Sequence, residues 1–220
     1  RGANEAFMSE VADRAGVVEG SIYRFFSNKR DLVERVVEHW YEDMLADYAA
    51  QFEGVRGVRN QLRFIIYHHL SSIKKEPALS RIVFQELRPA TDYRSSRIFE
   101  LNQAYTQRIV DVVRAAVKSG EFREDVSPSL ARDMIFGSIE HRTWAYLRNE
   151  GDFDAGKTAD AITDFVYRAL CKTEGQPGDR VAAALSRLED VADRLQDILR
   201  APASKTEGGT RKRASRQTLK

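Results

Sequence analysis

Residues 18–29 gather several side chains that can donate hydrogen bonds to a polyanion. The hydroxyl of Ser21 and the guanidinium of Arg24 could both reach base edges, and arginine to guanine is the commonest specific contact with DNA. Lys29 adds a positive charge where the next helix is expected to begin, and the first turn of a helix offers free N–H groups to a phosphate. The chemistry indicated is noncovalent binding of phosphates and base edges.

No enzyme site is visible in the sequence. The adjacent His68 and His69 would point about 100° apart on a helix, which does not suit a shared metal ion. The chain lacks a cysteine–histidine spacing for zinc, a phosphate-binding glycine loop and the G-x-S-x-G turn of hydrolases. We therefore predict a protein that is not an enzyme and that holds no metal.

The donors lie within the stretch Met8–Ser27, which has the pattern of a helix-turn-helix. A small residue at Ala12 lets a second helix cross the first closely, and Gly16 suits the left-handed backbone of the turn between them. The expected helices cover Met8–Ala15 and about Val18–Phe26. Their contacts, and the core of this segment, are expected at apolar positions: Val11, Ala15, Val17, Ile22, Phe25 and Phe26.

Apolar residues continue at helical spacing, without the alternation typical of strands. The pattern predicts an all-α chain, with helices near residues 29–52, 58–73, 79–87, 98–116, 128–149 and 161–170. Ser127 and Pro128 are typical of a cap followed by proline at the first helical position. Residues 151–156 are expected to form a loop.

The C-terminal part differs in composition. Residues 173–179 have the composition of a linker, and apolar residues then alternate steps of four and three over Val181, Leu185, Leu188, Ala192, Leu195 and Leu199. Two interpretations of this heptad pattern stay open, a helix docked on the body or a short coiled coil with a partner chain. Residues 201–220 hold six basic residues and one acidic residue, and we predict a basic, disordered tail.

Composition sets further limits. The 220 residues are 42% hydrophobic and 31% charged, as in ordinary globular proteins. The net charge is +2, so the basic surplus of the tail leaves the rest of the chain mildly acidic. No run approaches the roughly 20 apolar residues that span a bilayer, so no membrane partner is expected. The single Cys171 cannot form an internal disulfide, which favours a reducing, cytoplasmic compartment.

The run EVADRAGVVEGSIYRFFSNKRDLVERVV resembles the DNA-binding segment of the TetR/AcrR family of bacterial transcription regulators. The family has a helix rich in small residues, then A-G-V, a short recognition helix ending in Y-x-x-F, and K-x-x-L at the start of the next helix. This sequence supplies Ala15-Gly16-Val17, Tyr23 with Phe26, and Lys29 with Leu32. The resemblance covers about 30 residues.

The resemblance implies a DNA-binding role, residue by residue. Tyr23 and Lys29 match the tyrosine and lysine with which the family contacts phosphates. The residues that would face the major groove or its phosphates are Val18, Glu19, Gly20, Ser21, Tyr23 and Arg24. Glu19 is repelled by phosphates, so a capping or solvent role competes with base reading at that position.

The sequence departs from the family pattern in three places. Val18 stands where Ser or Thr is common, and Ala6-Phe7 stand where threonines are common. The family's first helix has no counterpart, so we expect that it lies upstream of Arg1 in a longer gene product.

The resemblance also implies a helical body that binds a small molecule and forms a homodimer. Candidate pocket residues, for each of which a purely structural core role is the alternative, are Phe64, Tyr67, His68, Phe84, Tyr105 and Phe136. Residues 131–146 and 161–170 could build a four-helix dimer interface, with Gly137 and Ser138 allowing close approach. The effector is unidentified, and weak similarity near residues 120–137 suggests acyl-CoA or another apolar ligand.

These observations predict a ligand-responsive dimeric repressor that places a recognition helix in the major groove of a palindromic double-stranded operator. The predicted domains are a helix-turn-helix domain over 1–46 (motif about 7–27), a helical regulatory and dimerisation domain over 47–172, a linker and amphipathic helix over 173–200, and a tail over 201–220. The alternative is a helical protein-interaction module that uses the heptad helix and the basic tail.

Overall fold

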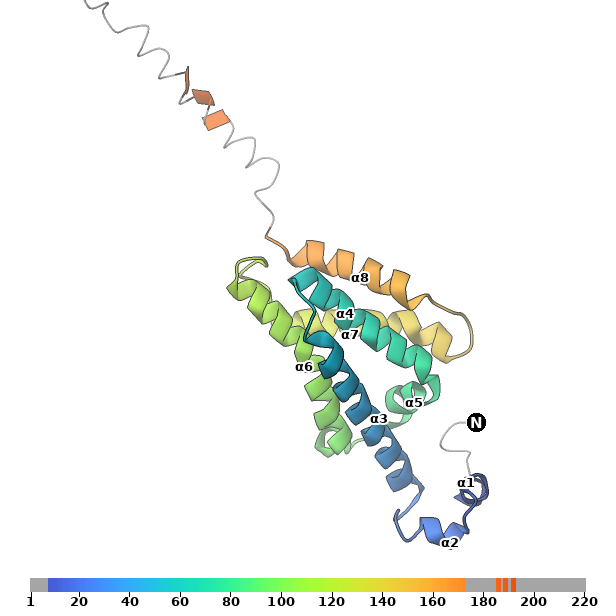
Figure 1. Ribbon diagram of the computed structural model, residues 1–220. Coiled ribbons are helices and arrows are strands. Elements are labelled where there is room, and N and C mark those ends of the chain that lie inside the picture. The colour runs from blue at the N-terminus through green and yellow to red at the C-terminus, as the bar shows by residue number, and fades with distance from the viewer. Residues whose placement is uncertain (1–7, 173–184, 187, 190, 193–220) are drawn as a thin grey trace, which may run out of the picture. The chain divides into compact units, whose positions relative to one another are not determined.

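The computed structural model describes residues 8–172 together with 185, 186, 188, 189, 191 and 192 (Figure 1). Every regular element in this part of the chain is helical, and its β-type pairing is limited to an isolated antiparallel bridge between Phe122 and Cys171. The all-α class predicted from the sequence is therefore confirmed.

The first three helices are α1 (Met8–Ala15), α2 (Glu19–Ile22) and α3 (Lys29–Phe52). The bounds of α1 and α3 agree with the prediction, but α2 is much shorter than the expected helix over 18–26. The residue before it, Val18, stands at the N-cap position without a capping side chain, and Ile22 is the one buried residue of α2, so little packing extends the helix.

The next elements are α4 (Val58–Lys75), α5 (Pro77–Ile82), a π-helical turn (Val83–Leu87), a 3₁₀ turn (Tyr93–Ser95) and α6 (Arg97–Lys118). The single helix predicted over 79–87 is thus wrong in its details. It begins at Pro77, because the fixed φ of proline suits the first helical position, and its last turn widens into a π-helix.

The last two helices of this part are α7 (Pro128–Leu147) and α8 (Ala155–Leu170). As predicted, Ser127 caps α7, accepting a hydrogen bond from the backbone N–H of Leu130 at 3.3 Å. Helix α8 begins inside the stretch predicted as a loop, because Asp154 caps it by accepting from the N–H of Lys157 at 2.8 Å.

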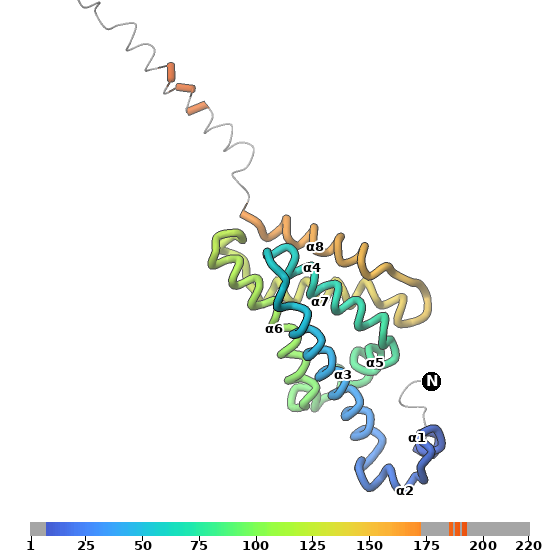
Figure 2. The backbone as a smooth tube through the Cα atoms, viewed as in Figure 1, coloured from blue at the N-terminus to red at the C-terminus, as the bar shows by residue number. Residues whose placement is uncertain are grey.

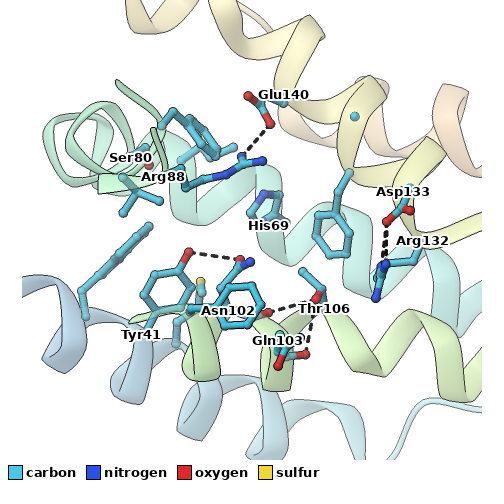
Figure 3. Close-up of a pocket in the computed structure, with 18 of the residues that line it drawn as sticks. Tyr41, His69, Ser80, Arg88, Asn102, Gln103, Thr106, Arg132, Asp133 and Glu140 are labelled. Carbon is cyan, nitrogen blue, oxygen red and sulfur yellow. Dashed lines mark hydrogen bonds and ion pairs between the residues drawn. The ribbon is translucent and has the colours of Figure 1, made fainter. Parts of the chain in front are cut away.

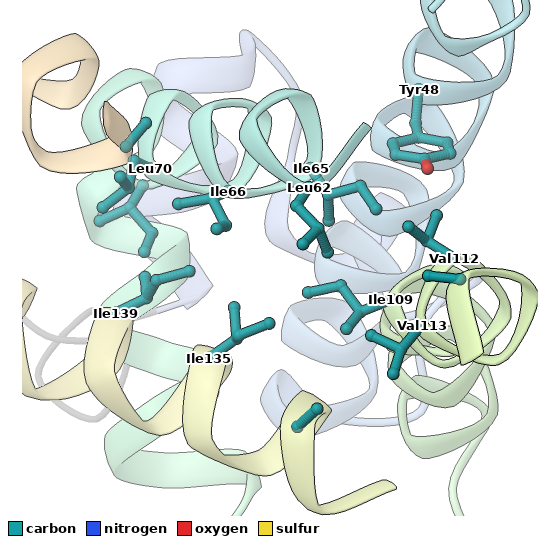
Figure 4. Packing of buried hydrophobic residues seen from close by; sticks show 14 of the residues in the cluster. Tyr48, Leu62, Ile65, Ile66, Leu70, Ile109, Val112, Val113, Ile135 and Ile139 are labelled. Atoms are coloured by element: carbon teal, nitrogen blue, oxygen red, sulfur yellow. The ribbon is translucent and has the colours of Figure 1, made fainter. Parts of the chain in front are cut away.

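The main hydrophobic core lies where α4 meets α6, α7 and α8. Figure 4 shows the aliphatic side chains of α4 facing those of α6 and α7. Eight of the labelled side chains are completely buried: Leu62, Ile65, Ile66, Leu70, Ile109, Val113, Ile135 and Ile139. Along the backbone tube of Figure 2, α8 runs beside α4, and Arg63 bonds Asp160 across this pair at 2.6 Å.

A second cluster joins α3 to α6 and to the π-helical turn. Its buried members from α3 are Val37, Tyr41 and Met44, and they meet Val83 and others from the later elements. This cluster fixes the middle of α3 on the body, while the first turn of α3 continues into the small N-terminal segment (Figure 1).

The C-terminal residues 173–220 form a separate unit. The predicted linker, most of the heptad pattern and the basic tail lie outside the described residues. The six described positions are helical and exposed: Leu185, Ser186, Leu188, Glu189, Val191 and Ala192. In the parts of the chain that the structure describes, no helix is long and apolar enough to cross a membrane.

Candidate nucleic-acid interface and ligand cavity

Helices α1 and α2 meet around a very small core. Met8, Ala12 and Ile22 are its buried members, and Ala12 is 2% exposed. Gly16 adopts φ +69° between the two helices, a conformation that a side chain with a Cβ rarely takes. The backbone N–H of Val17 bonds the carbonyl of Ala12 at 3.0 Å, which closes the turn as the sequence predicted.

The residues after the turn point mostly to solvent. Val18 is 74% exposed and Tyr23 is 49% exposed, while Glu19, Gly20 and Arg24 are exposed and Ser21 is half-buried. The structure therefore presents these predicted contact residues together on one short stretch. No ion pair within the described residues involves Tyr23's neighbour Arg24, so its guanidinium is available to an external acceptor.

Phe25 contradicts its predicted place in the core. Its side chain is 76% exposed, and Val17 is 44% exposed. The N–H groups of Phe25 and Phe26 both bond the carbonyl of Ile22, at 2.9 and 3.0 Å. The chain turns there, so that Phe26 packs against the Met8–Ala12–Ile22 cluster and Phe25 points away from it.

The first turn of α3 is rigidly capped beside this stretch. Asn28 Oδ1 accepts from the N–H of Asp31 at 3.0 Å, and Asp31 accepts from both the N–H and the hydroxyl of Ser27. These bonds from Ser27 lower the pKa of the Asp31 carboxyl, so it stays ionised. Lys29 is the first residue of α3 and half-buried, where its ammonium adds to the positive end of the helix dipole.

Arg30 links this region to the body. Its guanidinium bonds both carboxylate oxygens of Asp92 at 2.7 Å, and its Nε bonds Glu34 at 2.7 Å. Asp92 lies in the loop between the π-helical turn and α6. The same loop continues to Arg94, which lines a cavity inside the body.

This cavity, called the inner cavity below, has a volume of about 490 Å³, within the roughly 300–1,000 Å³ typical of ligand sites. Five α-helices, the π-helical turn and the 3₁₀ turn before α6 contribute to it. Its apolar and aromatic lining residues are Trp40, Tyr41, Met44, Ile73, Val83, Phe84, Phe99 and Phe136. Its polar lining residues are His69, Ser80, Arg88, Arg94, Asn102, Gln103, Thr106, Arg132, Asp133 and Glu140.

The charges of the inner cavity are only partly neutralised. Arg88 bonds Glu140 at 2.7 Å and Arg132 pairs with Asp133 at 2.8 Å, as the dashed lines of Figure 3 mark. Arg94 makes no hydrogen bond or ion pair within the described residues. The cavity therefore combines an apolar wall with one uncompensated positive charge, a lining that suits an amphiphile with an anionic part.

A second hollow, the outer groove, lies between α3 and α4 and has a volume of about 570 Å³. Trp40 and Met44 line both spaces and so form the wall between them. Three of the predicted pocket residues, Phe64, Tyr67 and His68, line the outer groove.

The predicted pocket residues are thus not brought together in one site. Phe84 and Phe136 line the inner cavity, and Tyr105 lines neither space because it is packed in the core at 1% exposure. The Tyr105 hydroxyl bonds His68 Nδ1 at 3.0 Å, and burial raises the pKa of the phenol. Burial lowers the pKa of His68, which keeps that imidazole neutral.

Sequence reasoning missed the arginines of the inner cavity, and also Trp40 and Met44. Arg88 and Arg94 lie in or beside a loop, where no periodicity reports which way a side chain points. Trp40 and Met44 belong to the apolar stripe of α3, so their pattern alone does not separate a cavity wall from an ordinary core. The described residues include no group of three or more side chains that could hold a metal ion.

Two family models match most of the chain. Residues 1–36 match the model described as "Bacterial regulatory proteins, tetR family", and residues 38–169 match "YsiA-like protein, C-terminal region". The fatty acid metabolism regulator protein of Bacillus subtilis is 23% identical over 169 residues, which cover 77% of this chain and 87% of the relative. The transcriptional repressor KstR2 of Mycobacterium tuberculosis is 26% identical over 157 residues, covering 67% and 72% of the two chains.

A solved structure shares the fold. The transcriptional regulator FadR from Bacillus subtilis, crystallised in complex with stearoyl-CoA, superposes with a TM-score of 0.68 at 23% identity. The match covers 76% of this chain and 89% of FadR.

Proposed function

This chain belongs to the TetR family of bacterial regulatory proteins, and from that premise we propose which of its residues bind DNA, effector and partner subunit. The protein is a ligand-responsive, DNA-binding transcription regulator that acts as a dimer, and its relatives are transcription regulators rather than enzymes. The proposal assigns the effector class as acyl-CoA and the outcome of effector binding as release of the operator.

The DNA contacts come from the exposed stretch between α1 and α3. We assign the phosphate contacts to Tyr23 and Lys29, because the first turn of α3 adds its free N–H groups to the lysine charge. Ser21 and Arg24 read base edges in the major groove. Val18, Glu19 and Gly20, at the start of α2, face the same groove and supply shape and methyl contacts.

The observation that carries the effector assignment is the mixed lining of the inner cavity. Trp40, Met44 and Phe136 offer an apolar wall for a fatty acyl chain, and Arg94 offers an unpaired charge for a phosphate. An acyl-CoA joins these two chemistries in one molecule. The stearoyl-CoA bound to the FadR relative supports the same class.

The dimer face is assigned to α7 and α8. Leu130, Met134 and Trp144 of α7 are 58%, 62% and 51% exposed, and Phe165 of α8 is 73% exposed. Gly137 lies among them, and a Cβ built there would meet no atom within 4 Å, so a partner helix can approach closely. Covering these apolar side chains against a second copy removes them from water.

Footprinting and binding titrations test the proposal. The protein should protect a palindrome upstream of its own gene, and hexadecanoyl-CoA should release it at micromolar concentration, whereas free coenzyme A should not. Phe165→Glu should sediment as a monomer and lose the footprint, since two half-sites must be bound together. Equal affinity for the palindrome and for scrambled DNA at moderate salt would refute the DNA assignment.

A further inference from the structure

His69 is the one polar residue of the inner cavity whose side chain has a buried atom without a partner. Four residues in the described part of the chain carry such an atom: Tyr48, His69, Tyr93 and Thr163. Of these four, only His69 lines the inner cavity or the outer groove. An orphaned nitrogen costs stability, so its presence at a cavity wall indicates a hydrogen bond that a ligand completes.

Aromatic neighbours hold the imidazole of His69 at this wall. Its ring centroid lies 5.0 Å from that of Phe136, edge to face, and 5.5 Å from that of Tyr105. Figure 3 shows the ring between Arg88 and Asn102, with the Arg132–Asp133 pair further along the cavity. Nδ1 has almost no exposed surface in this conformation, and no hydrogen bond within the described residues fixes either ring nitrogen. Presenting Nδ1 to a ligand in the cavity therefore requires a turn of the ring about its Cβ–Cγ bond.

The charge state of His69 limits what it can bind. Burial lowers the pKa of His69 to about 3, and the proximity of His68 and the positive charge of Arg88 act in the same direction. At neutral pH the ring therefore offers one N–H and one lone pair but no charge. A neutral carbonyl matches the N–H, whereas a phosphate or carboxylate suits the nearby arginines better.

We propose that His69 is a specificity-determining residue that donates a hydrogen bond to the thioester carbonyl of the acyl-CoA effector. This inference rests on the effector class assigned above. In an acyl-CoA the thioester carbonyl separates the apolar chain from the polar, phosphate-bearing part. His69 occupies the matching place, with Phe136 against its ring and Arg88 beside it.

The stability of the ligand-free protein distinguishes a ligand-binding histidine from one that only packs in the core. His69→Leu removes the orphaned nitrogen but keeps a side chain of similar bulk between Tyr105 and Phe136. The melting temperature of the ligand-free protein should rise by about 2–4 °C, the shift that one kcal/mol produces in a chain of this size. A lower melting temperature for His69→Leu would mean that the imidazole is there for packing, and would overturn the proposal.

The decisive experiment compares two ligands that differ only in the carbonyl. Hexadecanoyl-CoA has a thioester, and S-hexadecyl-CoA is the thioether without that oxygen. Isothermal titration of the wild-type protein should favour the thioester by about three- to tenfold, as expected for one neutral hydrogen bond. In His69→Leu the preference should vanish through weaker thioester binding, while His69→Asn, which keeps a polar atom near the Nδ1 position, should restore part of it.

Thr163→Val is the matched control. It also removes an orphaned buried polar atom, in α8 and away from both cavities, so it should raise stability without changing the ligand preference. Equal binding of both ligands by the wild-type protein, or an unchanged preference in His69→Leu, would overturn the role of His69 while leaving the effector class intact. If the wild-type protein binds neither ligand, the effector class itself is wrong and the role of His69 falls with it.

Discussion

The stretch proposed to contact DNA, residues 18–29, and the inner cavity display their polar groups in opposite ways. Between Val18 and Lys29, most residues point outward from a segment with three buried apolar side chains. The inner cavity turns polar groups inward from α4 to α7 and from the turns before α6, supported by the large core around α4. The first site depends on local backbone geometry, and the second depends on how distant helices pack.

The largest expected difference between the two regions is in stability. Ile66 is completely buried, so Ile66→Ala should lower the free energy of unfolding by about 2–5 kcal/mol. Val18 is 74% exposed, and Val18→Ala should stay within about 0.5 kcal/mol of the wild type. Urea unfolding followed by circular dichroism measures both, and similar losses in the two variants would remove the contrast.

Within the stretch proposed to contact DNA, substitutions of the two basic residues should have different effects, one on sequence discrimination and the other on overall affinity for DNA. Arg24→Gln should cost about 1–3 kcal/mol of discrimination between operator and scrambled DNA. Lys29→Gln should weaken binding to both DNAs alike and reduce the slope of log affinity against log salt concentration by about one. Lys118→Gln, at the exposed end of α6, is the control, and fluorescence anisotropy at several salt concentrations is the measurement.

The imidazole of His69 at the inner cavity should make the protein less stable as the pH is lowered. The pKa of His69 is about 3 in the folded protein and near 6.5 when unfolded, so only the unfolded chain takes up the proton between these values. Stability should therefore fall by about 1.4 kcal/mol for each pH unit below 6.5 from this residue. The difference in unfolding free energy between wild type and His69→Leu, measured at pH 7, 6 and 5, isolates this slope from that of His68 and the carboxylates.

The smallest effect is expected at the ion pair that joins the two regions. Arg30 and Asp92 are 53% and 55% exposed, so water and salt screen their attraction. Asp92→Asn should change the melting temperature at pH 7 by less than about 1 °C. Arg30 lowers the pKa of Asp92, so any stabilisation by the pair is present above pH 3.8 and is lost as the pH falls further. A large loss of stability at neutral pH would show that the two regions depend on each other for folding.

The sequence was most informative where structure is local. Gly16, Ser127 and Pro128 act within a few residues of themselves, so the first turn and the start of α7 followed from residue types. Helix α2 and the start of α8 were misjudged, because packing and the cap at Asp154 decided their ends.

The cavity shows the limit of helical periodicity. A 3.6-residue period tells which side chains of α4 share a face, but not which helix that face meets. Phe64 and His68 therefore seemed equivalent to Phe136, although they line a different space. The orphaned nitrogen of His69 has no sequence signal, since it exists only through the positions of Tyr105 and Phe136 around it.

Helix α3 runs unbroken from Lys29 to Phe52, so a displacement beside the inner cavity can be transmitted along it to the stretch proposed to contact DNA. If Tyr48, which is 1% exposed, serves as the pivot, Trp40 lies about 12 Å from it along the helix and Lys29 about 28 Å. A sideways push of about 1 Å by a ligand at Trp40 then becomes roughly 2 Å at Lys29. In a two-fold symmetric dimer, both DNA-binding segments move, so the distance between them changes by twice that displacement. The half-sites that they must reach lie about 34 Å apart. A small displacement beside the inner cavity would thus change the separation of the two recognition helices in the dimer.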